Sequence, residues 1–204
     1  MFSAPFKVFN QAAKDVWDDK ANLILVNMLS VMACLTVVFA PPAVFGLYYT
    51  ANRLAAGESL GLTGLFQGGR KYFLQSWLWA GINIIVFLII SLNLSFYEQM
   101  PGTWGSVLQY FFVFVLMIWL TIQFFALAYF MKMEEKKVLL ALRNGWFTFM
   151  ASPGYSLVLM VLALIVVVFS TALLFPIVLV TPGLLACWGT RAVQERLAAL
   201  GIRE

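Results

Sequence analysis

The sequence predicts an all-α, polytopic membrane protein whose five to six membrane-embedded helices pair as up-down hairpins. Of its 204 residues, 63% are hydrophobic and only 11% are charged, and the mean hydropathy is +0.92. An average soluble domain carries about 25% charged residues, so this chain has too little polar surface for a water-soluble globule of its size. In addition, all thirteen Lys and Arg residues fall between the long apolar stretches.

These basic residues also predict how the chain is threaded, because Lys and Arg that flank a span stay in the cytoplasm. If the apolar stretches form three hairpins, every Lys and Arg lies on one side and the hairpin tips carry none. The alternative has four spans, at residues 21–40, 73–96, 107–131 and 154–180. It would separate Lys20 from Arg70 and would place Arg191 outside, so the charges favour the hairpins, with both termini cytoplasmic.

The whole chain, residues 1–204, is expected to be one integral membrane domain. It begins with a cytoplasmic amphipathic segment, residues 1–20. Within it, apolar residues recur at helical spacing over residues 3–20, opposite a face of Lys and Asp, which is typical of a helix in the headgroup layer. Three helical hairpins follow, over residues 21–57, 73–131 and 154–191.

The first hairpin begins with residues 21–40, an uncharged stretch that would span about 30 Å as a helix. Pro41 and Pro42 cannot continue the helical hydrogen bonds and predict a bend. A short return helix then ends near Arg53, whose long side chain can extend to the interface. The glycine-rich residues 58–72 predict a cytoplasmic loop with a short amphipathic piece.

The second hairpin consists of residues 73–96 and 107–131, joined by a loop without basic residues. Trp77 and Trp79 are expected to anchor its start at the interface. A second amphipathic surface helix is expected over residues 133–149, interrupted at Asn144-Gly145.

The third hairpin rises over residues 155–175. Pro176 and Pro182 are expected to bend it, and residues 183–190 return toward Arg191.

Two weak sequence echoes suggest an internal repeat of helical hairpins. An offset of 140 pairs Pro42 with Pro182, Tyr48 with Trp188, and Thr50 with Thr190. An offset of 76 pairs Gly69 with Gly145, Phe73 with Phe149, and Ser76 with Ser152.

The chemistry of the chain argues against an enzyme and against ion coupling. No ionisable side chain lies near the centre of a span, which argues against a proton-coupled pump, a voltage sensor or an intramembrane metalloprotease. The chain has no His, and Cys34 and Cys187 lie in apolar runs, where they behave as small hydrophobes. We therefore expect no catalytic residues, no metal site and no cofactor. The basic residues match anionic lipid headgroups rather than nucleic acid.

Neutral polar residues at membrane depth have two interpretations. Hydrogen bonds between helices explain most such residues, and the alternative is a polar cavity for a small neutral solute such as a sugar. The candidates for these roles are Asn27, Tyr48, Tyr49, Asn52, Asn83 and Gln123.

Several short stretches resemble a known family. Asn22 to Asn27, Leu35 to Val38, Pro42-Ala43 and Leu47-Tyr48 are similar to the opening signature of the YesL-like family of bacterial membrane proteins. Arg70-Lys71-Tyr72-Phe73, Asn83 and Tyr97 also resemble its pattern. The likeness covers most of the chain and is strongest over residues 20–100. Pro41-Pro42 departs from the family's single proline before alanine.

The resemblance implies a multi-pass protein of the bacterial cytoplasmic membrane, in a family often encoded beside carbohydrate uptake systems, and supplies no catalytic residues. We expect a non-enzymatic accessory component associated with carbohydrate uptake. Its partners would be the lipid bilayer and a sugar transporter complex, contacted through the two amphipathic segments. The alternative is a stand-alone carrier or channel for a small neutral solute.

Overall fold

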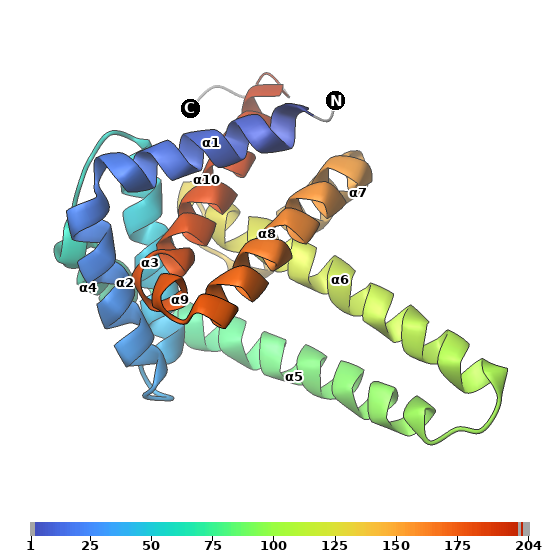
Figure 1. Ribbon diagram of the computed structural model, residues 1–204. Helices are drawn as coiled ribbons and strands as arrows, with labels where there is room; N and C mark the ends of the chain where they lie inside the picture. Colours follow the sequence, from blue (N-terminus) through green and yellow to red (C-terminus); the bar gives the residue numbers. More distant parts are fainter. Residues whose placement is uncertain (1–2, 200, 202–204) are drawn as a thin grey trace.

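The computed structural model describes residues 3–199 and 201, and over this part of the chain it is an all-α bundle of ten helices (Figure 1). The helices are α1 (Ser3–Asp18), α2 (Lys20–Cys34), α3 (Ala40–Ala55), α4 (Gly61–Lys71), α5 (Phe73–Glu98), α6 (Thr103–Lys132), α7 (Val138–Ala151), α8 (Pro153–Leu173), α9 (Phe175–Leu179) and α10 (Thr181–Ala199).

The helices form three similar units around a common centre. Three inner helices, α3, α6 and α10, contact one another, and an outer helix precedes each of them: α2, α5 and α8. A further helix packs along each inner helix, and these pairs, α3 with α4, α6 with α7 and α10 with α1, make the most extensive helix contacts of the described chain. Each inner helix also touches the outer helix of the next unit, through α3–α5, α6–α8 and α10–α2, so the units close into a ring.

The sequence echo with an offset of 140 falls at matching places in two units. Pro42 and Pro182 both lie in the first turn of an inner helix. Thr50 and Thr190 each donate a hydrogen bond to the carbonyl four residues earlier, at 3.0 and 2.8 Å. The inner helices α3 and α10 are thus built alike at both points.

Glycines bring each inner helix close to the helix packed along it. A Cβ atom on Gly46 of α3 would collide with the carbonyl oxygen of Leu65 in α4. One on Gly68 would lie 2.5 Å from the Cβ of Tyr49. Gly145 of α7 has the same relation to α6, where its Cβ would be 2.8 Å from a carbonyl oxygen. The backbones therefore touch, as small residues allow between closely packed helices.

Within the described residues, three helices are long and apolar enough to cross a membrane: α5, α6 and α8. In their most apolar stretches only 17%, 39% and 28% of the residues are buried within the protein. The α5–α6 hairpin also projects away from the other helices (Figure 1). These exposed apolar helices indicate a multi-pass membrane protein. Contact of their apolar side chains with lipid is favourable, whereas contact with water is costly.

The first hairpin differs from the prediction in its dimensions. Its outer helix α2 ends at Cys34 after 15 residues, about 22 Å, instead of continuing to residue 40. The chain turns over residues 35–39, and Pro41 and Pro42 then lie in the first turn of α3, where a proline nitrogen needs no helical partner. Neither helix is among the three candidate spans.

The last inner helix is longer than predicted. Pro176 and Pro182 each occupy the second position of a helix, so they begin α9 and α10. The expected helix over residues 183–190 continues to Ala199, and Trp188 at its middle is fully buried.

The amphipathic segments also differ from the prediction. The apolar face of α1 covers α10, with the rings of Phe9 and Trp188 4.8 Å apart, so much of this face is not free to lie in headgroups. The short amphipathic piece expected within the glycine-rich residues 58–72 is the eleven-residue helix α4. The expected interruption at Asn144-Gly145 is wrong, because α7 continues through both residues and Gly145 is needed for its contact with α6.

Candidate functional site

A small cavity lies where the inner helices meet the outer helices α5 and α8. Its volume is about 220 Å³, and Tyr48 of α3, Trp79 of α5 and Gln123 of α6 bring its only polar side-chain groups. Aliphatic, phenylalanine and methionine side chains form the rest of the lining.

Most of this polarity is used within the protein. The indole N–H of Trp79 donates to Oε1 of Gln123 at 2.7 Å, and Nε2 of Gln123 is buried without a hydrogen-bond partner. One turn further along the α5–α6 pair, Asn83 donates to the carbonyl of Trp79 at 2.8 Å and accepts from the indole of Trp119 at 3.1 Å. Asn83 therefore joins the two helices. Apart from these hydrogen bonds, the lining keeps the buried amide NH2 of Gln123 and the Tyr48 hydroxyl.

Asn27 lies elsewhere and joins helices. It is fully buried on α2, where its Nδ2 donates to the carbonyl of Leu179 at 2.8 Å. Its Oδ1 accepts the backbone N–H of Gly183 at 2.7 Å. Gly183 is the third residue of α10, so Asn27 satisfies an N–H group that the helix itself leaves unpaired.

Two further candidates do not line the cavity. The ring of Tyr49 lies 6.3 Å from that of Tyr72, and the Arg53 guanidinium lies 5.6 Å from the Tyr49 ring. Asn52 is partly buried on the same helix and is not part of the lining.

Of the six sequence candidates, the structure therefore brings Tyr48 and Gln123 to one cavity and places Asn83 beside it. Sequence reasoning missed Trp79, which it assigned to the interface. The residue type carried the signal, because a partly buried indole N–H needs an acceptor, and Gln123 supplies one.

The cavity is suited to a small, largely apolar molecule. A sugar would bring several hydroxyl groups into a lining that offers few partners, and unpaired buried hydroxyls are costly. Among the residues described, no three His, Cys, Asp or Glu side chains come together in a way that could hold a metal ion.

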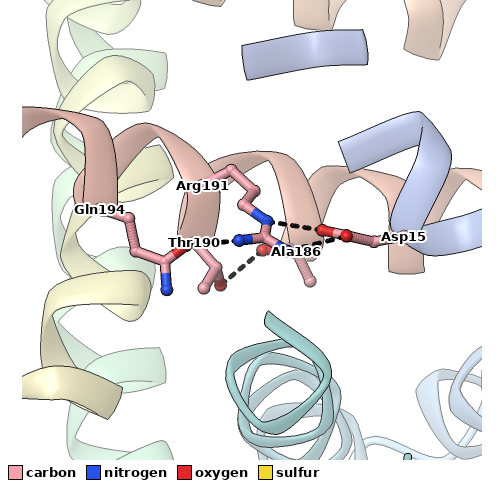
Figure 2. A network of polar contacts seen from close by, with 5 residues as sticks. All are labelled: Asp15, Ala186, Thr190, Arg191 and Gln194. Atoms are coloured by element: carbon pink, nitrogen blue, oxygen red, sulfur yellow. Dashed lines mark hydrogen bonds and ion pairs between the residues drawn. The ribbon is translucent and has the colours of Figure 1, made fainter. Parts of the chain in front are cut away.

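A charged network joins α1 to α10, away from the cavity (Figure 2). Arg191 donates from Nε and Nη2 to the two carboxylate oxygens of Asp15, at 2.6 and 2.8 Å. Its Nη1 donates to Oε1 of Gln194 at 3.1 Å. The hydrogen bonds to Asp15 raise the pKa of Arg191, and the pair holds the two helices together.

Comparison of the chain with protein-family models, with curated proteins and with solved structures gives no match. The fold by itself defines an all-α helical bundle with three candidate membrane spans.

Proposed function

We propose that the chain is a multi-pass protein of the bacterial cytoplasmic membrane that acts as a non-enzymatic accessory component of carbohydrate uptake. The observation that carries the membrane assignment is the exposure of the three long apolar helices. The resemblance to the YesL-like family supports the bacterial membrane and the link to carbohydrate uptake.

The charges around the α5–α6 hairpin support its orientation across the membrane. Lys71 precedes α5 and Lys132 ends α6. Lys136 donates from Nζ to the carbonyl of Met131 at 2.8 Å, and burial together with the nearby Lys71 lowers its pKa. The tip, residues 99–102, has no basic residue. The base of the hairpin is therefore cytoplasmic and its tip is outside.

The surface of α7 supports the accessory role. After folding, α7 still exposes large apolar side chains, namely Leu139, Trp146, Phe147 and Met150. This helix lies near the basic end of the hairpin, so its exposed side chains can dock on the cytoplasmic side of a transporter.

One observation favours the alternative of a stand-alone carrier for a small neutral solute: the amide NH2 of Gln123, a residue of the cavity lining, is buried without a hydrogen-bond partner. The small volume and apolar lining of this cavity make the accessory role the better supported of the two.

Labelling of single engineered cysteines is expected to place the two ends of the α5–α6 hairpin on opposite sides. In a Cys34→Ala background, Gln99→Cys should react with a membrane-impermeant maleimide in intact spheroplasts. Lys137→Cys should react only after permeabilisation. Both positions are exposed, so the reagent can reach either cysteine within its own compartment. Cys187 is buried and should not contribute background labelling. Labelling of both positions from the same side would contradict the threading.

Extraction in a mild detergent is expected to recover membrane subunits of a sugar uptake system with the wild-type chain. Phe147→Ser should reduce this recovery, because it removes an exposed apolar side chain of α7 without changing the core. Glu134→Gln, an exposed change in the loop before α7, is the matched control and should keep the subunits. Recovery of the wild-type chain alone would count against the accessory role.

A further inference from the structure

A second hollow, larger than the central cavity, lies between α2 and the segment formed by α4 and the start of α5. Its volume is about 550 Å³. One wall is formed by Leu29, Met32 and Ala33, at positions i, i+3 and i+4 of α2, together with Thr36 in the turn that follows the helix. The opposite wall has the same spacing: Phe66, Gly69, Arg70 and Phe73. This spacing places each set on one side of its segment, so the two walls face each other across a groove.

The floor of the groove is the start of α3. Pro42 and Ala43 line it, and a Cβ on Gly69 would lie 3.0 Å from the carbonyl oxygen of Pro42. Because Gly69 has no side chain, α4 lies directly on α3 and the groove stays open above this contact. Phe39, which is 58% exposed, lies at the turn between α2 and α3.

Arg70 is the one charged side chain in the lining. It is exposed, and it has no hydrogen bond or ion pair to any described residue. Lys71 beside it lies over the Tyr72 ring at 5.3 Å, and Lys136 is near Lys71. The groove is therefore apolar along its length and positively charged at one end.

We propose that this groove holds one acyl chain of an anionic phospholipid, with the lipid phosphate bound by Arg70. The apolar walls suit a hydrocarbon chain, and a guanidinium binds phosphate oxygens through two parallel hydrogen bonds. The neighbouring lysines add attraction for a net negative headgroup. The inference rests on the membrane location proposed above and is independent of the accessory role.

The test uses the full chain, purified in mild detergent, stripped of lipid and then titrated with one phospholipid at a time. Native mass spectrometry measures the bound lipid. The wild-type chain should bind phosphatidylglycerol more tightly than zwitterionic phosphatidylethanolamine. Arg70→Gln should weaken phosphatidylglycerol binding by about tenfold, the loss expected for a charge-assisted hydrogen bond, and should remove the preference. Lys71→Gln is the matched control, since its side chain is not part of the lining, and should keep most of the binding.

A second variant tests the acyl-chain site. Ala33→Trp fills the groove from the α2 wall and should reduce binding of both phospholipids, whereas Arg70→Gln should affect mainly the anionic one. Unchanged binding in Arg70→Gln, or equal loss in Arg70→Gln and Lys71→Gln, would overturn the proposal. Competition by inorganic phosphate alone, without any dependence on the acyl chain, would also overturn it.

An alkaline wash of membranes separates the two proposals. Release of the wild-type chain by the wash would defeat the membrane assignment. Retention without lipid preference would defeat only the lipid site.

Discussion

Gly46→Ala is expected to destabilise the protein by about 3 kcal/mol or more, because the added methyl group meets main-chain atoms. Its Cβ would collide with the carbonyl oxygen of Leu65 and lie 3.0 Å from that residue's carbonyl carbon. Neither atom can rotate away as a side chain would, so α4 has to separate from α3. For a chain of this size we expect the melting temperature in detergent, followed by circular dichroism, to fall by about 6–12 °C.

Gly81→Ala is the matched control for this variant. Gly81 lies within α5, and a Cβ there would have no neighbour within 4 Å. Alanine favours a helix over glycine by about 0.5–1 kcal/mol, so this variant should melt at the same or a slightly higher temperature. Similar losses in both variants would show that the α3–α4 contact is not the cause.

Asp15→Asn is expected to cost about 2 kcal/mol and to loosen α1 from α10. The side chains of Asp15 and Arg191 are only 17% and 25% exposed, so the change leaves a mostly buried guanidinium without its counter-charge. Limited trypsin digestion gives a local readout, because the exposed Lys7 lies on α1 and its peptide bond does not include the substituted residue. Cleavage after Lys7 should become several-fold faster, while cleavage at the exposed Lys137 should not change.

Glu135→Gln serves as the control for loss of an ion pair. It breaks the contact of Glu135 with Lys137, at 2.8 Å, in which both side chains are about two-thirds exposed. Such a surface pair contributes little to stability, because water screens it. The exchanged pair, Asp15→Arg with Arg191→Asp, should restore part of the lost stability. If the exchange gives no recovery and α1 is cleaved no faster in Asp15→Asn, the ion pair does not hold α1.

The α5–α6 hairpin could be predicted from sequence to within a few residues at most of its ends, whereas α10 could not. In the hairpin, uncharged apolar residues end where basic or turn-forming residues begin, and this pattern is local. The helix α10 continues past Arg191 to Ala199, and this part packs on distant segments: Ala192 and Val193 are fully buried, and Arg191 binds Asp15, 176 positions away in the chain. No local pattern contains such a partner.

The glycine-rich residues before α5 show a different limit. Glycine disfavours a helix in isolation, so the sequence predicts a loop with only a short amphipathic piece. In the folded chain Gly64, Gly68 and Gly69 let α4 approach α3, and this contact stabilises the helix. Tertiary packing thus outweighs the local preference.

For the candidate site, residue type indicated which side chains are polar at membrane depth, but their positions in the sequence did not indicate which of them line the cavity. A neutral amide at membrane depth either only joins helices, as Asn27 and Asn83 do, or joins helices and also lines a cavity, as Gln123 does. The rotation of each helix about its axis decides between these outcomes. That rotation depends on the packing of all three units and cannot be read from one segment.

The partnership of α1 with α10 sets an order for folding during synthesis. The helix α1 leaves the ribosome before the other described helices, and α10, which covers its buried Val8 and Ala12, leaves after them. By contrast, α4 and α7 each follow closely the helix on which they pack. The nascent chain can therefore complete two units cotranslationally, while α1 keeps its apolar face exposed at the translocon until α10 emerges.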